Sequence, residues 1–364
     1  ILDALRTAHG VWDRRRRRRR MTAREVESKM RWIAPTLDLT GMGGVDLIVE
    51  AVVEDPDIKR KVLAELEERM GDGTVFASNT SSIPIADIAA RARRPERVVG
   101  MHFFNPVDRM PLVEVIAGPQ SSAEAVATVR DLAIRLGKTP IVVRDTPGFL
   151  VNRILTFYLA EALRLLEEGV RIEVVDPAME RFGMPMGPFA VMDQVGLDVA
   201  VHVAGVLQKA FGDRASGSTK ALDGLLSSGR LGAKNGRGFY RYRDGKRTVP
   251  DRETYNLAGV GPARDLPPET VQERLLLSMI NEAAVCLDEQ VCRGAAEVDL
   301  AMVLGAGFPP FRGGLLHHAD EVGVAVVVDR LARLADAHGE RFRPATLLRR
   351  MVREERQFFG SAVR

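Results

Sequence analysis

Short apolar runs alternate with amphipathic stretches between about residue 45 and residue 144 of the 364-residue chain. Helical periodicity falls at about residues 57–70 and 123–136. Apolar strands that alternate with helices predict a mostly parallel sheet that is buried on both faces. The predicted strands are residues 45–53, 74–79, 97–104, 112–118 and 139–144.

The first 33 residues have a different pattern, which predicts two helices. Arg14 to Arg20 form an unbroken basic run between them. Thr22 followed by Glu25 makes a capping box, so we expect the second helix to start just past the arginine run.

At Asp145-Thr146-Pro147-Gly148 the pattern changes, and helical periodicity dominates from there on. Thr146 can cap a helix that has Pro147 at its first position. Glycine commonly ends a helix. The expected helices are residues 150–169, closed by Gly169, residues 172–182, closed by Gly183, and a third that begins near Pro188.

The helical half contains an internal repeat, which indicates two copies of one helical module. The residues that recur in the same order are Arg153 with Glu161-Ala162 and Arg274 with Glu282-Ala283, Val175-Asp176-x-Ala178-Met179 and Val298-Asp299-x-Ala301-Met302, and Asp193-x-x-Gly196 and Asp320-x-x-Gly323. We therefore expect an α/β domain over residues 1–145, a first helical module over 146–245 and a second over 268–364.

The composition is that of a globular protein, with 46% apolar and 28% charged residues. No run of about 18 apolar residues occurs, so we expect no membrane span. Cys286 and Cys292 have no metal-ligand spacing, and we expect no bound metal. We interpret both cysteines as reduced side chains in a helical region, which fits a reducing compartment.

The formal net charge is only +3, and outside the arginine run the chain is slightly acidic. The run Arg14 to Arg20 therefore allows three interpretations. It is a solvated helix face or disordered basic segment, or a site for a phosphate-rich ligand, or a nucleic-acid contact. No aromatic or motif context supports the third, so we expect no nucleic-acid partner.

His102 falls at the carboxyl end of a predicted strand, the edge of an open parallel sheet where ligands bind. Glu114 lies in the next predicted strand and could lie beside it. A carboxylate beside an imidazole fixes its tautomer and stabilises the imidazolium, which makes a general base. The alternative is a structural histidine. A carboxylate in an apolar strand needs a partner, and Glu114 therefore weakens this alternative.

Three further polar groups are candidates for ligand contacts. Ser78 to Ser82 could hold a substrate hydroxyl or a cofactor ribose, or could cap a helix over residues 84–91. Asn152, polar among apolar neighbours, could donate to a substrate carbonyl or be a capping residue. Lys234, in the glycine-rich stretch 233–240, could serve a ligand or belong to an ordinary surface turn.

No G-x-G-x-x-G follows a strand near the start of the chain. Gly41-x-Gly43-Gly44 comes before a predicted strand, which is the wrong context for a dinucleotide-binding turn.

With these residues in order, the chain resembles the 3-hydroxyacyl-CoA dehydrogenase family over nearly its whole length. The duplicated helical module resembles the multifunctional β-oxidation α-subunits, with their Gly-Phe-Pro-Pro-Phe segment at Gly307 to Phe311. The motifs that carry the resemblance are Val49-Glu50-Ala51-x-x-Glu54, Ser78-Asn79-Thr80-Ser81-Ser82, His102-Phe103-Phe104-Asn105-Pro106, Asp145-x-Pro147-Gly148-Phe149-x-Val151-Asn152-Arg153 and Pro185-Met186-Gly187-Pro188-Phe189.

The resemblance implies a Rossmann-like, doubly wound α/β domain and the NAD-dependent oxidation of (S)-3-hydroxyacyl-CoA to 3-ketoacyl-CoA. It implies that His102 is the catalytic base, with Glu114 as its partner, and that Ser81 and Asn152 hydrogen-bond the substrate oxygens. The residues that it implies near the cofactor NAD are Glu54 and Lys59 on the ribose side, Ser81 close to the nicotinamide, Asn105 and Lys234.

The resemblance also sets expectations beyond these residues. The family's first strand, glycine turn and helix should precede residue 1, and a basic helix over residues 1–20 could meet the 3′-phosphate of coenzyme A. An enoyl-CoA hydratase domain, a thiolase subunit and homo- or hetero-oligomers are the expected partners besides the acyl-CoA substrate. The few cysteines favour a bacterial cytoplasm, with a mitochondrial location left open. Alternative functions are a related β-hydroxy acid dehydrogenase, which usually has a lysine as its acid or base, and an inactive scaffold fragment.

Overall fold

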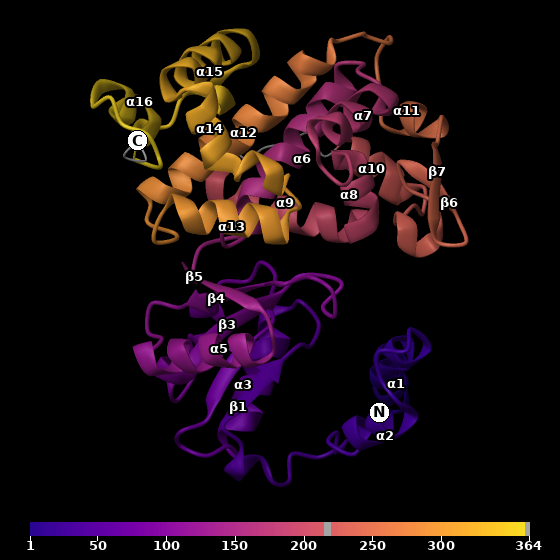
Figure 1. The fold of residues 1–364 in the computed structure, drawn as a ribbon, viewed down its shortest axis with the longest axis vertical. Helices are drawn as coiled ribbons and strands as arrows, with labels where there is room; N and C mark the ends of the chain where they lie inside the picture. Colours follow the sequence, from indigo (N-terminus) through magenta and orange to yellow (C-terminus); the bar gives the residue numbers. More distant parts are fainter. Residues whose placement is uncertain (215–219, 361–364) are drawn as a thin grey trace.

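The computed structural model describes residues 1–214 and 220–360. Figure 1 shows a sheet with its helices below and a larger helical part above, joined where β5 leads into α6. The first two helices lie to one side of the sheet, at the end of a long connection.

Five strands form the sheet, in the order β1-β2-β3-β4-β5. All neighbours are parallel except β3 and β4, which confirms the prediction of a mostly parallel sheet. The exception follows from the short loop between β3 and β4, because a parallel crossover needs a dozen or more residues. The strands are β1 (Leu47–Glu50), β2 (Val75–Ser78), β3 (Val98–Phe103), β4 (Leu112–Ala117) and β5 (Thr139–Arg144).

The sheet is buried on both faces, as the continuous apolar runs predict. Alternate residues of one strand belong to different hydrophobic clusters: Val98 packs with the cluster under the helical part, and Val99 packs with α5 on the other face. The helices of this part are α3 (Pro56–Glu67), capped by Asp55, α4 (Ile85–Ala89) and α5 (Ala123–Arg135), capped by Ser122.

The first helices are α1 (Leu2–Arg17) and α2 (Ala23–Met30). Thr22 and Glu25 form the predicted capping box at the start of α2, with Thr22 N donating to the Glu25 carboxylate at 2.7 Å. Arg14 in α1 donates to Asp108 at 3.1 Å, so the basic run lies against the loop that follows β3.

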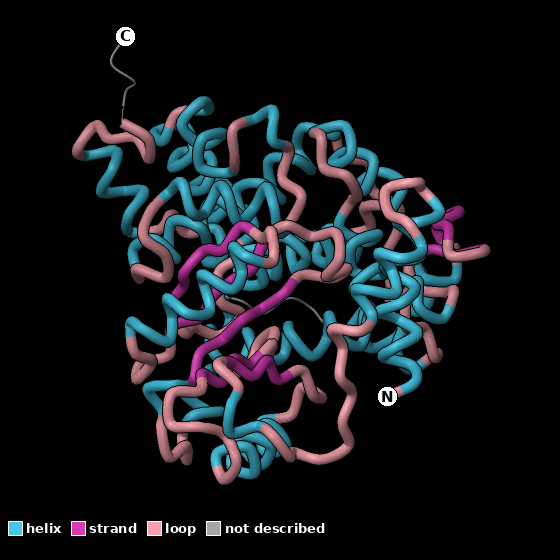
Figure 2. Tube along the Cα trace, turned by 60° about the horizontal axis from the view of Figure 1, so that its bottom comes forward, coloured by secondary structure: helices cyan, strands magenta, loops and turns pink. Residues whose placement is uncertain are grey.

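The helical part begins with α6 and carries one small antiparallel hairpin, which Figure 2 shows at the rim of the molecule. Its elements are α6 (Val151–Glu167), α7 (Ile172–Phe182), α8 (Pro188–Val195), α9 (Leu197–Phe211), α10 (Lys220–Ser227), β6 (Tyr240–Arg243), β7 (Lys246–Pro250), α11 (Glu253–Leu257), α12 (Pro268–Asp288), α13 (Ala295–Gly305), α14 (Leu315–Val322), α15 (Val324–His338) and α16 (Thr346–Arg353). Short 3₁₀ turns are Met42–Gly44, Pro95–Arg97, Gly212–Arg214, Ala233–Asn235, Pro310–Arg312 and Glu340–Phe342.

The helix ends at Gly169 and Gly183 are confirmed, since both glycines have positive φ angles just after α6 and α7. The predicted start of this helix at residue 150 agrees with α6, but the predicted cap is wrong. Thr146 does not cap the helix, and Pro147 is not its first residue, because the chain passes through the left-handed region at Gly148 (φ 73°) and Phe149 (φ 52°) before α6 begins.

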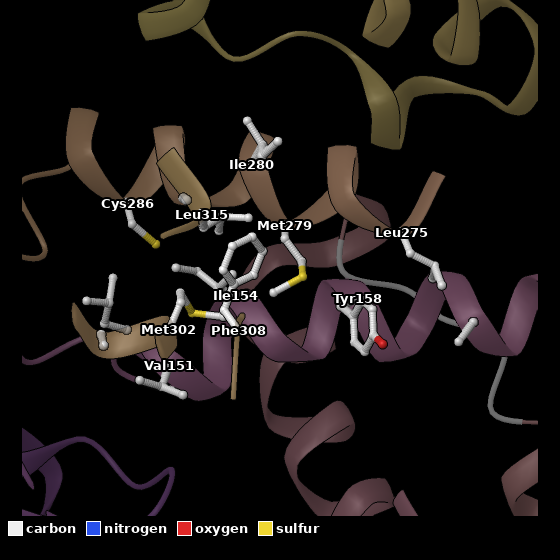
Figure 3. Packing of buried hydrophobic residues seen from close by; sticks show 14 of the residues in the cluster. Val151, Ile154, Tyr158, Leu275, Met279, Ile280, Cys286, Met302, Phe308 and Leu315 are labelled. Atoms are coloured by element: carbon white, nitrogen blue, oxygen red, sulfur yellow. The ribbon is translucent and has the colours of Figure 1, made fainter. Parts of the chain in front are cut away.

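The repeat in the sequence has a physical counterpart in the fold. α6 packs on α12 through buried apolar side chains that Figure 3 shows, among them Ile154 and Tyr158 against Leu275 and Met279. In each module an aspartate at the same position accepts two successive backbone amides: Asp176 those of Phe189 and Ala190, and Asp299 those of Leu316 and His317.

Among residues 1–214 and 220–360, a membrane-spanning length and apolarity are reached only by α8 and α9 together, and a bend of 102° separates them.

Candidate active site

His102 and Glu114 form a buried pair at the edge of the sheet. The antiparallel register of β3 and β4 puts them directly opposite each other, so their side chains share one face. His102 Nδ1 lies 2.8 Å from Glu114 Oε2, and both side chains are buried. The contact leaves Nε2 of the imidazole as the nitrogen that can take a proton from a ligand.

The second oxygen of Glu114 is held by the start of α6. Oε1 accepts from the backbone amides of Leu150 at 3.1 Å and Val151 at 3.0 Å. The left-handed conformation of Gly148 and Phe149 turns these two amides toward the sheet. A helix N-terminus carries partial positive charge, so these two amides hold the carboxylate of Glu114 in place beside His102.

Two aromatic rings surround the imidazole of His102. The ring of Phe104 lies 4.6 Å from it and the ring of Phe149 lies 5.8 Å from it, measured between centroids. These apolar neighbours restrict water and fix the orientation of the ring.

The serine-rich segment at the end of β2 surrounds one carboxylate. Glu54 Oε1 accepts from the Thr80 hydroxyl at 2.8 Å, from Ser81 N at 2.8 Å and from Ser82 N at 3.1 Å. Burial alone would raise the pKa of Glu54, but these hydrogen bonds and the Lys59 ammonium outweigh it and lower the pKa below its ordinary value. The segment does not cap a following helix, because α4 has no side-chain cap and its first amides donate to Asp145.

Lys59 is fully buried beneath this segment. Its Nζ lies 2.9 Å from Glu50 Oε1 and 3.4 Å from Glu54 Oε2. The second oxygen of Glu50 accepts from the Ser78 hydroxyl at 2.6 Å. Lys59 therefore fixes the two carboxylates at the end of β1 and has no surface of its own to offer a ligand.

Asn152 links the serine-rich segment to α6. Its Nδ2 donates to the backbone oxygen of Ser81 at 3.0 Å, so one turn of α6 holds both Glu114 and Ser81. The structure thus brings together six of the expected residues in two linked groups, His102 with Glu114, and Asn152 with Ser81, Glu54 and Lys59.

Two expected residues stand apart from these groups. Asn105 is exposed in the loop after β3. Lys234 lies in a 3₁₀ turn of the first helical module, where its Nζ pairs with Asp198. Within residues 1–214 and 220–360, no hydrogen bond or ion pair joins Lys234 to His102, Ser81 or Glu54.

Two residues of the quoted motifs, Glu50 and Asn79, shape the site through contacts that sequence reasoning did not predict. Glu50 is the partner of Lys59, and Asn79 Oδ1 accepts from Phe103 N at 3.0 Å, which ties the end of β2 to the end of β3. For Glu50 the signal is present in the sequence, since a carboxylate in an apolar strand needs a partner as much as Glu114 does. For Asn79 only the register of the strands reveals the contact.

The His102–Glu114 pair has the chemistry to remove a proton from an alcohol that lies against the imidazole. The residues at the ends of β1 and β2 fit the ribose of a dinucleotide, because Glu54 keeps 26% of its side chain exposed while only Lys59 contacts its Oε2. Exposed Val52 and Val53 beside it offer an apolar surface to an aromatic base. Within the described residues no group of three or more potential metal ligands occurs.

Comparison with known proteins agrees with this geometry. Residues 1–146 match the family of the 3-hydroxyacyl-CoA dehydrogenase NAD binding domain, and residues 148–242 and 271–358 match the 3-hydroxyacyl-CoA dehydrogenase C-terminal domain. The chain belongs to the 3-hydroxyacyl-CoA dehydrogenase family. NAD is the cofactor of this family's first domain.

Individual proteins of known identity are similar to this chain over two thirds of its length or more. A fatty acid oxidation complex subunit alpha from Idiomarina loihiensis is 42% identical over 360 residues, which are 99% of this chain and 51% of that protein. The chain thus spans about half the length of this curated relative. The crystal structure of 3-hydroxybutyryl-CoA dehydrogenase from Escherichia coli is similar with a TM-score of 0.85 and 28% identity, covering 97% of this chain and 91% of that one. The structure of (S)-3-hydroxybutyryl-CoA dehydrogenase from Ralstonia eutropha is 36% identical, with a TM-score of 0.64, over 67% of this chain and 87% of that one.

Proposed function

We propose that the protein oxidises (S)-3-hydroxyacyl-CoA to 3-ketoacyl-CoA with NAD, as a step of fatty-acid β-oxidation. The buried His102–Glu114 pair, at 2.8 Å, carries the proposal, because a carboxylate-backed imidazole is the base that this oxidation needs. The family and the fatty acid oxidation relative support the choice of substrate.

In the proposed mechanism, His102 Nε2 removes the proton of the substrate 3-hydroxyl. Held by Glu54 and the Ser81 segment, NAD would supply the acceptor for the hydride that leaves carbon 3. Glu114 stabilises the imidazolium that forms, since its own charge is fixed by the amides of Leu150 and Val151. Ser81 and Asn152 orient the substrate oxygens and polarise the forming carbonyl.

The cofactor contacts that we propose involve Glu54 and Ser81 directly. Glu54 would accept from ribose hydroxyls through Oε2, and the Ser81 segment would lie beside the nicotinamide. Lys59 would act through Glu50 and Glu54, because it is fully buried. Asn105 and Lys234, which stand apart here, would contribute only if the ligand extends to their loops.

For the basic run we propose the 3′-phosphate of coenzyme A as its ligand. The contact of Arg14 with Asp108 brings α1 next to the loop after β3, on the side where His102 lies. Four arginines of the run form no ion pair with a described residue and are exposed: Arg15, Arg18, Arg19 and Arg20. Guanidinium groups bind phosphate through charge-assisted hydrogen bonds.

The wider assignments are also proposals: domains over residues 1–145, 146–245 and 268–364, an enoyl-CoA hydratase domain and a thiolase subunit as partners, and a bacterial cytoplasmic location. The relative that is a fatty acid oxidation complex subunit alpha supports a complex of several domains.

The test uses the full-length protein with acetoacetyl-CoA and NADH, followed by absorbance of the reduced cofactor. We expect His102→Ala and Glu114→Gln each to lower turnover by about 10²- to 10⁴-fold, the range for a lost general base, with little change in melting temperature. His317→Ala serves as the control, since His317 is half exposed in the second module and should leave turnover unchanged.

Near-wild-type turnover in both variants would refute the assignment. Turnover of free β-hydroxy acids but not of acyl-CoA would favour the related dehydrogenase instead. Absence of any heat signal on titration with NADH would favour a scaffold role.

A further inference from the structure

A buried arginine at the start of α6 reaches across to the end of α12. Arg153 Nε donates to Glu282 Oε1 at 2.6 Å, and its Nη1 donates to Glu289 Oε2 at 2.6 Å. Arg153 is fully buried, and Arg214 also approaches Glu282 at 3.0 Å. Because α6 and α12 run antiparallel, these contacts join the first turn of α6 to the carboxyl-terminal part of α12.

The repeat produces a second copy of this arrangement at the opposite end of the same two helices. Arg274 in α12 donates through Nε to Glu161 Oε1 at 2.8 Å and through Nη1 to Glu168 Oε2 at 2.7 Å. Arg341 approaches Glu161 at 2.8 Å, as Arg214 approaches Glu282 in the first copy. The two arginines therefore have equivalent partners and nearly equal burial.

Only one of the two copies adjoins the catalytic pair. Arg153 directly follows Val151 and Asn152, whose backbone amide and side-chain amide hold Glu114 and Ser81. Arg274 lies in the second turn of α12, and its hydrogen-bonding partners Glu161 and Glu168 both lie at the far end of α6 and its cap.

The end of α12 is itself fixed to the sheet. The guanidinium of Arg144 donates to the backbone oxygen of Glu289 at 3.3 Å, and its backbone amide donates to that of Val291 at 2.8 Å. Arg144 ends β5, which pairs with the strand that carries Glu114. The partners of Arg153 are thus held by the same sheet that presents the catalytic carboxylate.

We propose that Arg153 is a positioning residue: by joining the first turn of α6 to the sheet-bound end of α12, it fixes the two backbone amides that hold Glu114 against His102. The inference rests on the function proposed above, because it assigns a role within that same site. A guanidinium suits this role, since its planar fork holds two carboxylates in a fixed geometry. A small displacement of the amides would move Glu114 away from the imidazole, and such misplacement costs turnover rather than binding.

The repeat supplies the control for the experiment. Arg153→Met and Arg274→Met are compared in the full-length protein by melting temperature, by kcat and KM with acetoacetyl-CoA and NADH, and by the pH profile of kcat/KM. We expect both variants to lose a similar amount of thermal stability. Only Arg153→Met should lower kcat, by about 10- to 100-fold, with KM little changed. It should also shift the alkaline limb of the pH profile, because His102 must carry the proton when the reaction runs from acetoacetyl-CoA and NADH.

A second readout does not depend on turnover. The NMR signal of the His102 ring is identified by its loss in His102→Ala, and its chemical shift at fixed pH is compared among the variants. A change of the His102 signal in Arg153→Met, absent from Arg274→Met, supports the inference. This holds even if the wild-type protein turns over no acyl-CoA, because missing turnover would contradict only the proposed function. An unchanged signal in Arg153→Met, or equal losses of kcat in the two variants, overturns the inference.

A milder pair of variants decides the case if a methionine variant fails to fold. Glu289→Gln and Glu168→Gln each remove one carboxylate charge from an equivalent position, and their side chains are 46% and 27% exposed. The same outcomes apply: an effect on kcat and on the His102 signal in Glu289→Gln alone supports the inference, and equal behaviour of the two variants overturns it.

Discussion

Two carboxylates in apolar strands have different kinds of partner in this molecule. Glu114 faces an imidazole and two helix amides, a set that holds the carboxylate beside a ring that can take up a proton. Glu50 faces the ammonium of Lys59 and the hydroxyl of Ser78, a set that only neutralises its charge. Burial alone therefore does not distinguish the carboxylate that we propose as catalytic from one that only pairs with a lysine, whereas the identity of the partner does.

Lys59→Met tests the structural assignment of this ion pair. It leaves Glu50 as a buried charge without its cation, so we expect the free energy of unfolding to fall by about 3–5 kcal/mol, measured by urea denaturation. Lys61→Met, on the exposed side of the same helix, should change it little. Equal denaturation midpoints for the two variants would show that Lys59 is not needed for the fold.

At this scale the sequence predicts the types of the site residues better than their contacts. His102 and Glu114 could be paired from their strands alone. The convergence of Thr80, Ser81 and Ser82 on Glu54 could not, because it depends on how the loops after β1 and β2 meet, and Glu54 and Thr80 are 26 residues apart in the chain. Lys59 carries no mark in the sequence that separates a ligand contact from a buried partner.

At the scale of elements, strands and helices follow from periodicity, and their ends follow from caps. The capping box before α2 and the glycines after α6 and α7 lie where the sequence places them. The cap of α6 differs from the predicted one because the first amides of this helix donate to Glu114, a residue more than 30 positions earlier in the chain. A local cap is recognisable from sequence, whereas a cap supplied by tertiary structure is not.

Asp176, which lies in α7 and accepts amides from the first turn of α8, predicts a pH dependence of stability. Burial is the largest influence on Asp176 and raises its pKa to about 6, above its ordinary value of 3.8, although Phe189 N, Ala190 N and the Tyr240 hydroxyl donate to it. The folded state then binds more protons than the unfolded state between these two values. Its contribution is fully present below about pH 4 and is lost as the pH rises through about 6.

We therefore expect wild-type stability to fall more steeply between about pH 4 and pH 6 than the stability of Asp176→Asn, measured by chemical denaturation at each pH. Asp329→Asn, on the exposed face of α15, should keep the wild-type slope. Identical slopes for all three proteins would contradict the assignment.

At the scale of the whole molecule, the second module covers the first. α12 lies on α6 and hides the apolar face that carries Ile154, Tyr158 and Leu165. The two modules thus meet as two subunits of a symmetric dimer would, because Arg153 and Arg274 each donate to a glutamate of the other helix.

A chain that ends at residue 267 tests this view. It would expose the face of α6 and leave Arg153 without Glu282, so we expect two copies to associate, with Arg153 of each meeting Glu161 of the other. Light scattering after size exclusion should give twice the mass of the shortened chain. Glu161→Arg in the same shortened chain should weaken the association. A stable monomer of the shortened chain with Glu161 unchanged would refute the symmetry argument.

Main-chain amides hold Glu114, so the contact does not depend on which side chains occupy positions 150 and 151. Every amino acid except proline supplies an N–H at positions 150 and 151, so mutational drift there alters packing while the contact persists. A comparison that scores side chains alone will pass over this contact. Proline scanning of the two codons is the genetic experiment that would expose it.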